Sequence, residues 1–523
     1  MSAAPGLEPD PPASDPSWRR MHPATPAIKG WKVLVGVLTV LGFQVADDLR
    51  PLLEDLGGRA VLVVLGGVAL ITLVGFLYSL VAWRMTRFAV TDDAVHLHSG
   101  ILFRQQRQAR LDRLQAVDIV QPLLARLTGL AELRLDVAGG SGSNVSLAFL
   151  READAQALRT ELLALAAGLR RPGSAPAAPV AAAPAVAPAD DASAPVSTAP
   201  AEGERAGAEA YGPFPAPAAA TGPTVPSAFE DAPERFLYEV PPMRVVVSTL
   251  RSTAFAVVVV GLVALGVAIV QTGDLEMVFF ALPALLGSAG VLWNRVNRGV
   301  GFRGAISPDG IRLRHGLTET RSQTVPPGRI QAVRLSQGPW WRGPDWWSVE
   351  INVAGYAGEG QDQAETVLHP VATREEALLA LWLAVPDLGV EDPRALVDAG
   401  LTGVDDDGGF VPSPRSARWV DPVGRRRRGV RVTPTALLVR SGRFWRRLDV
   451  VPHERTQSLG LEQGPLQRRL GLASFVVHST QGKVQPQADH LDGRTAAALL
   501  DEQAARARTA RTTAVPEQWM RGR

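Results

Sequence analysis

The 523-residue chain has few side chains whose types and spacing could do chemistry. It contains no cysteine, which excludes disulfides, cysteine-ligated zinc, iron–sulfur clusters and thiol catalysis. His96 and His98 lie on one side of a predicted strand, but no third ligand is near, so a surface pair is favoured over a metal site. The glycine-rich segment 139–143 joins two predicted strands, and no helix follows it to receive a phosphate. No nucleophile, base and orienting group can be assembled locally, so we expect no enzyme, cofactor or metal.

Arginine is concentrated in one region of the sequence. That region contains Arg425, Arg426, Arg427, Arg428, Arg431, Arg440, Arg443, Arg446 and Arg447. Beneath an anionic leaflet it would gain about 1 kcal/mol per charge. The alternative is a solvated strand edge that charge guards against pairing. We take Arg425–Arg428 with Arg443, Arg446 and Arg447 as the candidate surface for lipid or a partner.

Two further features leave alternatives open. The tryptophans Trp340, Trp341, Trp346 and Trp347 could form an exposed patch, although core packing is favoured. The net charge of only +2 argues against a nucleic-acid partner, which usually requires a strongly basic surface.

The elements that would position these residues include four apolar stretches, residues 28–46, 60–83, 252–270 and 277–293. They predict two transmembrane hairpins, since a helix of about 20 apolar residues crosses a bilayer; buried core helices are the alternative. Basic residues flank the hairpins on the side away from their short connectors, which places both termini and all long segments in the cytoplasm. The spans contain too few polar groups to carry a solute, so we interpret them as anchors in a multi-pass protein of the cytoplasmic membrane.

An internal repeat is the most informative pattern in the chain. Residues recur at constant offsets of 216 and then 126: Thr91, Gly100 and Gln115 match Ser307, Gly316 and Gln331, and then Thr433, Gly442 and Gln457. The recurring glutamines could mark a shared site, but backbone bonding that stabilises the fold is favoured.

Each copy is predicted to hold antiparallel strands followed by a helix. In the first copy, alternating apolar residues predict strands over 86–90, 94–99, 104–110, 114–121, 131–138 and 144–149. Leu158, Leu162, Leu165 and Leu169 then form one helical stripe. Thr373 and Glu376 predict a capping box before a helix over 377–383, and Asp492 is expected to cap the last helix. The fold class is therefore α+β: transmembrane helical hairpins plus three small β-barrels, each closed by a C-terminal helix.

These patterns divide the chain into nine segments. They are a polar tail (1–27), hairpin 1 (28–84), domain 1 (85–170), an Ala/Pro-rich linker expected to be disordered (171–234), hairpin 2 (235–295), domain 2 (296–390), a loop (391–424), domain 3 (425–508) and a tail (509–523).

The first copy carries Asp112-Arg113-Leu114-Gln115, Gln121-Pro122-Leu123-Leu124, Arg126-Leu127 and Gly129-Leu130, and the third keeps Gln457, Gln463, Pro465-Leu466 and Arg469-Leu470-Gly471-Leu472. With these motifs the chain resembles the bacterial pleckstrin-homology (bPH2) domain, and its hairpins and tandem modules are similar to YdbT-like membrane proteins. The resemblance implies a seven-strand barrel with a capping helix, membrane attachment, no catalysis, and a smaller two-helix relative as companion. The second copy departs from the motif at 340–344, and the third lacks a hairpin. The first turns of the copies are acidic or neutral, unlike those of phosphoinositide-binding domains.

We therefore expect a non-enzymatic membrane scaffold that presents tandem cytoplasmic domains to proteins or to the membrane surface. The expected partners are the lipid bilayer and a smaller two-helix PH-like membrane protein, with homo- and hetero-oligomers both open. Two alternatives stay open: a component of a membrane transport, export or resistance complex, and an enzyme with a site between modules.

Overall fold

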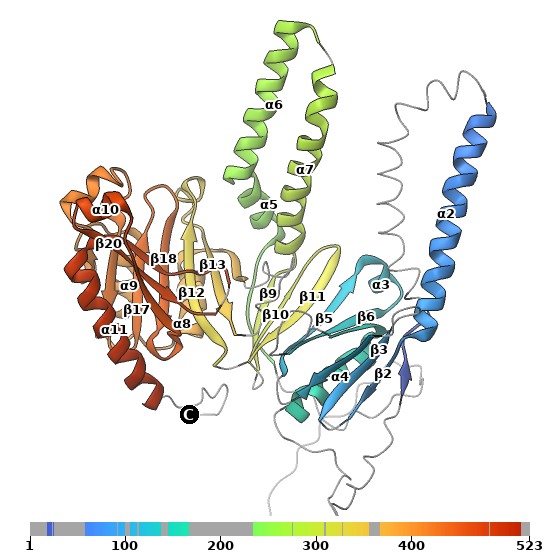
Figure 1. Ribbon diagram of the computed structural model, residues 1–523, viewed down its shortest axis with the longest axis horizontal. Coiled ribbons are helices and arrows are strands. Elements are labelled where there is room, and N and C mark those ends of the chain that lie inside the picture. The colour runs from blue at the N-terminus through green and yellow to red at the C-terminus, as the bar shows by residue number, and fades with distance from the viewer. Residues whose placement is uncertain are drawn as a thin grey trace, which may run out of the picture.

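The computed structural model describes residues 18–23, 25, 58–91, 93–99, 105–111, 114–137, 145–166, 234–274, 276–307, 310–326, 328–354, 367–480 and 482–513. The span predicted over 28–46, Gly100, and nearly all of the linker predicted over 171–234 lie outside these residues. Three β-rich modules lie in a row, and long helices project from one side of the row (Figure 1).

Each module contributes strands to two antiparallel sheets. The first module contains β1 (Arg19–Arg20), β2 (Arg87–Val90), β3 (Ala94–Ser99), β4 (Gln105–Arg110), β5 (Leu114–Pro122), α3 (Leu123–Leu127), β6 (Leu130–Val137), β7 (Val145–Arg151) and α4 (Glu152–Ala166). The second contains β8 (Arg235–Glu239), β9 (Arg303–Ser307), β10 (Gly310–His315), β11 (Glu319–Val325), β12 (Ile330–Gln337), the 3-10 turn η2 (Pro339–Trp341), β13 (Trp347–Val353), β14 (Val367–Ala372) and α8 (Arg374–Ala384). The third contains β15 (Val411–Pro412), β16 (Gly429–Val432), β17 (Ala436–Ser441), β18 (Arg446–Pro452), β19 (Ser458–Glu462), α10 (Pro465–Arg469), β20 (Leu472–His478), β21 (Gln487–Asp492) and α11 (Gly493–Thr513).

The predicted α+β class is confirmed, but the predicted closed barrels are wrong. The strand orders are β1-β2-β3-β4, β7-β6-β5-β11-β10-β9-β8, β14-β13-β12-β18-β17-β16-β15 and β19-β20-β21. The last three strands of one module thus continue into the first four strands of the next. Strand β5 pairs with β11, and β12 pairs with β18, instead of closing within a module.

Hydrophobic cores lie between the sheets and the closing helices. In the first module the predicted stripe is buried at Leu158, Leu162 and Leu165, while Leu169 lies outside the described residues. The core of the second module also receives Leu448 and Val450 from β18, so this core crosses the junction between modules. Burial of such leucine and valine side chains stabilises each module by roughly 1.5–3 kcal/mol per residue, and here part of that burial depends on the neighbour.

The long helices are inserted between the first and second strands of a module. Helix α2 (Gly58–Met85) leads into β2, and α5 (Pro242–Leu250), α6 (Thr253–Thr272) and α7 (Glu276–Gly299) lie between β8 and β9. In the third module residues 413–428 take this place, with the 3-10 turns η5 (Arg415–Trp419) and η6 (Arg425–Arg427). Within the described part of the chain, α6 is the one helix long and apolar enough by itself to cross a membrane. The prediction of four spans is therefore not confirmed.

Residues 391–424, predicted as a loop, contain a packed helix. Helix α9 (Pro393–Thr402) is capped by Asp392, whose carboxylate accepts a hydrogen bond from the Ala395 N–H at 2.9 Å. Leu396, Val397 and Leu401 are buried in the core of the second module. These apolar residues are few in a polar segment, which is why periodicity alone did not reveal the helix.

The predicted helix caps are confirmed. Thr373 and Glu376 form a reciprocal capping box at the start of α8, and Asp492 accepts hydrogen bonds from the first turn of α11.

The recurring glycines have a structural reason. Gly316 and Gly442 adopt φ of 113° and 80° in the turns before β11 and β18, where a Cβ would overlap a carbonyl oxygen.

We predict that Gly442→Ala lowers the stability of the protein by about 1–3 kcal/mol, because alanine must adopt a strained backbone and clash with the Trp445 carbonyl. The measurement is the midpoint of thermal unfolding in detergent. Gly338→Ala is the matched control, because Gly338 has φ −74° and open space around its Cβ position. Equal midpoints for the two variants would contradict the structural role of the recurring glycine.

A second prediction concerns His369 on β14, which stacks on Tyr238 with ring centroids 4.7 Å apart. Burial lowers the pKa of His369 to about 4; Glu376 opposes this shift, and Arg244 adds to it. The unfolded chain, with a histidine pKa near 6.5, therefore binds the proton more readily between pH 6.5 and 4. This histidine makes stability fall as the pH drops through that window.

His369→Phe keeps the ring stack and should flatten the dependence of the unfolding midpoint on pH between 6.5 and 4. His478→Phe, at an exposed histidine, serves as the control. Parallel pH profiles for the wild type and His369→Phe would show that protonation of His369 is not coupled to unfolding.

Candidate functional site

The surface of interest lies on the third module, at the place that the helical hairpin occupies in the second. It is formed by the β15–β16 connection (residues 413–428) and the β17–β18 turn (residues 442–445). In the second module the equivalent β10–β11 turn is bonded to the end of α7: the N–H of Gly316 donates to the Val300 carbonyl at 2.9 Å, and that of Thr318 to Asn297 Oδ1 at 2.7 Å. The third module thus presents a turn and a connection where its neighbour presents helices.

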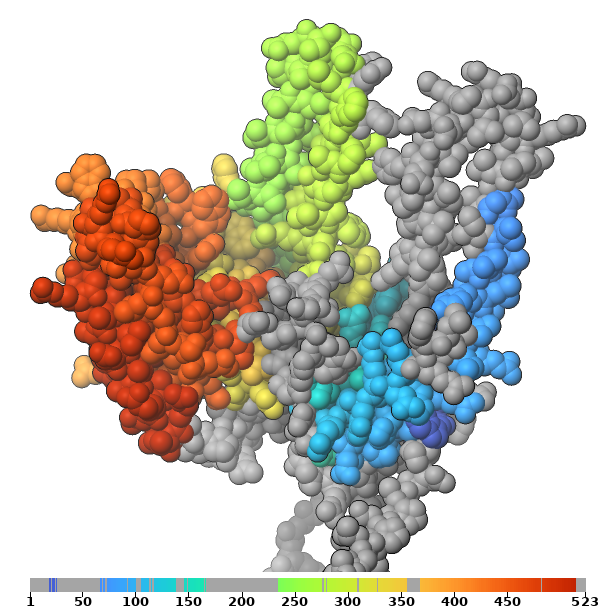
Figure 2. Space-filling view, in the orientation of Figure 1, coloured from blue at the N-terminus to red at the C-terminus, as the bar shows by residue number. Residues whose placement is uncertain are grey.

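The consecutive residues Trp341 and Arg342 link the β17–β18 turn to the base of the hairpin. Trp341 donates from Nε1 to the Ser248 carbonyl on α5 at 3.0 Å, and the Arg295 guanidinium of α7 lies over its ring. The next residue, Arg342, donates to the carbonyls of Arg443 and Phe444, the latter at 2.7 Å. The turn is therefore one short segment away from the helices. Figure 2 shows the orange surface of the third module beside the lower part of the α6–α7 hairpin.

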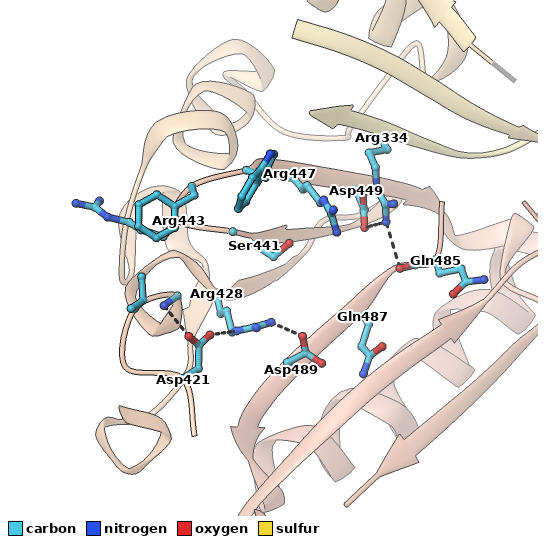
Figure 3. Close-up of a pocket in the computed structure, with 15 residues that line it drawn as sticks. Arg334, Asp421, Arg428, Ser441, Arg443, Arg447, Asp449, Gln485, Gln487 and Asp489 are labelled. Carbon is cyan, nitrogen blue, oxygen red and sulfur yellow. Dashed lines mark hydrogen bonds and ion pairs between the residues drawn. The ribbon is translucent and has the colours of Figure 1, made fainter. Parts of the chain in front are cut away.

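A pocket of about 490 Å³ opens between the turn, the connection and the β20–β21 region. At one end Arg334 makes two hydrogen bonds to Asp449, at 2.6 and 2.8 Å. At the other end Arg428 bridges Asp421 and Asp489, and Arg447 lies between the two ion-paired groups (Figure 3). Burial alone would raise the pKa of Asp421, but the hydrogen bond from Arg428 holds it below its usual range. Asp421 and Asp489 therefore pair with Arg428 at one end of the pocket, and Asp449 pairs with Arg334 at the other.

The structure places the four consecutive arginines in internal contacts. Arg427 is only 2% exposed and donates to the carbonyls of Gly400, Leu401 and Gly403 at the C-terminal end of α9, where carbonyls lack helical partners. Burial and the neighbouring Arg440 lower the pKa of Arg427 to about 9.

The other three members of the run are also engaged. Arg425 donates to the Ser413 carbonyl at 3.4 Å, Arg426 pairs with Asp405, and Arg428 forms the bridge described above. This run therefore organises the connection and the end of α9, and Arg426 is its most exposed member.

The remaining candidate arginines face the pocket or its rim. Arg446 donates to Gln337 Oε1 at 3.1 Å, and burial lowers its pKa. Arg443 and Arg447 are exposed, and within the described residues no carboxylate lies within ion-pair distance of either side chain. The four arginines that line the pocket face three aspartates, which leaves an excess of one positive charge.

Sequence reasoning missed the apolar part of this surface. Phe444 and Trp445 at the turn are 55% and 49% exposed, and Trp419 and Val423 of the β15–β16 connection are exposed as well. The available signal was the sequence Arg443-Phe444-Trp445-Arg446-Arg447, in which arginines flank two adjacent aromatic residues. We name Trp419, Val423, Phe444 and Trp445 the apolar rim.

A second apolar feature recurs in all three modules. Leu124, Trp340 and Leu466 occupy equivalent repeat positions on α3, η2 and α10, and each is exposed. Helices α3 and α10 lie on the side of the row of modules from which the long helices project (Figure 1). The four tryptophans of the second module do not form one exposed patch. Trp341 and Trp347 are buried, Trp346 is half-buried and Trp340 is exposed.

The other sequence motifs form no site in the part of the chain that is described. Gln331 donates from its side chain to the Arg329 carbonyl at 3.3 Å, and the Gln457 N–H donates to the His478 carbonyl at 3.0 Å. For Gln115 the structure places the backbone in β5. The ring of His98 lies against that of Trp18 at a tilt of 39°, and no group of three metal-ligating side chains occurs among the described residues.

Comparison with known proteins gives one match. A family model described as bacterial PH domain matches residues 36–166, 246–383 and 415–507, which together cover more than half of the chain. No curated protein and no solved structure matches the chain significantly. The first match includes α2 and the second includes α6 and α7, whereas the third begins within the β15–β16 connection.

Proposed function

Because this chain belongs to the bacterial PH domain family, we propose that it is a non-enzymatic scaffold of the larger, YdbT-like membrane type, whose third module docks on the membrane surface. Tandem PH-like domains support an interaction scaffold, and such domains are typically not catalytic. The observation that carries the docking proposal is the apolar rim with Arg443 and Arg447, at the position where the second module has the α6–α7 hairpin.

Support for membrane insertion comes from the long helices. Helix α6 has no charged residue, and Val260 and Val270 on it expose most of their surface. Helix α7 packs antiparallel to α6 and exposes Phe280 and Leu286. Such apolar surface is costly in water and stable in hydrocarbon. On this proposal α2, α6 and α7 anchor the chain in the cytoplasmic membrane, and all three modules lie in the cytoplasm.

This topology predicts opposite accessibility for two cysteine variants of the naturally cysteine-free chain. A membrane-impermeant maleimide should label Asp274→Cys, in the turn between α6 and α7, on intact cells. It should label Thr509→Cys, on the exposed face of α11, only after permeabilisation. Labelling of Thr509→Cys on intact cells would place the modules outside and contradict the proposal.

The chemistry of the third module suits an anionic leaflet. Tryptophan and phenylalanine partition to the interface between headgroups and acyl chains, and arginine gains energy from anionic lipid. Arg334 and Arg428 are held in ion pairs with aspartates, which leaves the guanidinium groups of Arg443 and Arg447 to contact phosphate groups beside the inserted rim. The exposed Leu124, Trp340 and Leu466 extend the same surface along the three modules.

We predict that an environment-sensitive fluorophore on Trp445→Cys is quenched by spin-labelled lipid when the full chain is in vesicles containing anionic lipid. A fluorophore on Thr509→Cys should stay in water. The double variant Arg443→Gln, Arg447→Gln should show weaker quenching at low salt. It removes two charges that each contribute about 1 kcal/mol, so docking becomes less favourable by about 2 kcal/mol. Salt should weaken it further. A label at 445 that remains in water at every lipid composition would exclude docking by this surface.

The full chain is required for this experiment, because the third module does not complete its own sheet. Strand β18 pairs with β12 of the second module, and an isolated third module would lose that partner.

A smaller two-helix PH-like membrane protein is proposed as companion, on the basis of the family resemblance. A stoichiometric small membrane protein recovered with the full chain from mild detergent supports this part of the proposal. No observation among the described residues favours a transport role or a hidden active site over the scaffold.

A further inference from the structure

The two junctions between modules repeat one strand register. In the first junction Ile119 lies opposite Ser322, and in the second Leu335 lies opposite Leu448. Ile119 and Leu335 are equivalent repeat positions, and so are Ser322 and Leu448. The junction is therefore a reproducible interface, in which the β5-type strand of one module pairs with the β4-type strand of the next.

A second contact recurs with the same spacing. Arg126 on α3 donates to the Leu317 carbonyl in the β10–β11 turn at 3.5 Å. The equivalent Arg342 donates to the Arg443 carbonyl in the β17–β18 turn. At both junctions an arginine of one module thus holds the turn of the next.

Among the described residues, the third module presents this interface without a partner. Its β5-type strand, β19, is the edge of a three-stranded sheet. Leu461 on β19 is 42% exposed, whereas the equivalent Ile119 and Leu335 are 5% and 0% exposed. Arg468, equivalent to Arg126 and Arg342, is exposed and makes no side-chain hydrogen bond within the described residues.

The first module presents the complementary edge. Its β4 is the last strand of the sheet β1-β2-β3-β4, and Gln105, Gln106, Arg107 and Gln108 are exposed. The equivalent residues of β11 and β18 are mostly buried at junctions, including Arg321 and Asp449 in ion pairs with Asp118 and Arg334. Neither β4 nor β19 contains a proline that would block pairing.

We propose that the occupant of both edges is a second copy of this chain, joined head to tail through β19 of one copy and β4 of the next. The repeated register places Leu461 opposite Gln106, and Gly460 opposite Arg107. Glu462 then lies diagonally across from Arg107, so the charges at the two edges attract. Strand addition of this kind supplies backbone hydrogen bonds along a whole edge.

A second copy fits because one chain carries both halves of the interface at its two ends. The first and third modules end the row, and the long helices project from one side of it (Figure 1). Copies added along the row therefore keep their helices on one side, as a bilayer requires. A head-to-tail interface of this kind closes into a ring or extends as a filament, depending on the angle between copies.

The chain lacks cysteine, so the register can be tested directly by cross-linking. Two full-length variants, Gln106→Cys and Leu461→Cys, are mixed in vesicles and oxidised. A disulfide-linked dimer is expected from the mixture. The off-register mixture of Gln106→Cys with Ser458→Cys should not cross-link, because Ser458 lies three residues away along the strand, about 10 Å. Absence of the dimer, or equal cross-linking of both mixtures, would overturn the proposal.

Association is measured separately by native mass spectrometry of the full chain. Leu461→Lys should lower the apparent association constant about ten-fold or more, since leucine burial is lost; Leu379→Lys, on the exposed face of α8, should not. Arg468→Ala should weaken association and the adjacent Arg469→Ala should not. A chain that stays monomeric at high density, or that binds only a different protein at β19, would refute assembly through a second copy.

Discussion

Pairing of strands between modules is the interaction on which the whole architecture depends. The first four strands of the second and third modules end at β11 and β18, whose outer edges present a row of backbone donors and acceptors. Leaving such groups unpaired in a buried position is costly. Here β5 and β12 satisfy them, and the ion pairs Arg321–Asp118 and Arg334–Asp449 lie directly on these seams. A shift in strand register would separate the two partners of such a buried pair and leave an uncompensated charge. The ion pairs therefore favour the observed register at each junction. The modules are consequently not independent folding units, and the core shared through Leu448 has the same consequence.

The local elements were largely predictable from sequence, and the pairing between them was not. Alternation of apolar residues predicted the strands of the first module to within one or two residues, because each strand buries one face. A sheet can close within one module or continue into the next module. Which of the two occurs depends on which strand edge lies beside it in the folded chain. Val117 and Ile119 give the same alternation in either arrangement. Helix α9 was missed because its buried face consists of few residues, and its capping Asp392 resembled any polar loop residue.

The candidate site was predicted in part. The basic region was found from composition, but charge in a sequence does not say whether an arginine points to solvent or to carbonyl groups. Arg427 caps the end of α9, and Arg428 bridges two aspartates that are distant in sequence. The exposure of the aromatic residues beside Arg443 and Arg447 was not predicted. Whether a tryptophan is exposed or buried depends on which residues surround it in the folded chain. The repeat does indicate one exposed apolar position. Leu124, Trp340 and Leu466 are large and apolar in every copy, although none belongs to a strand.

The insertion point of the long helices has a consequence for how such chains change over time. In each module the chain leaves the sheet after the first strand and returns in the neighbouring second strand, so the two ends of the insert are adjacent. The sheet therefore tolerates inserts of very different length at this point, as in the third module, where residues 413–428 replace a helical pair. A duplicated module can lose such a helical insert, or acquire one, without disturbing its strand ladder. The number of inserted helices can thereby change independently of the number of domains.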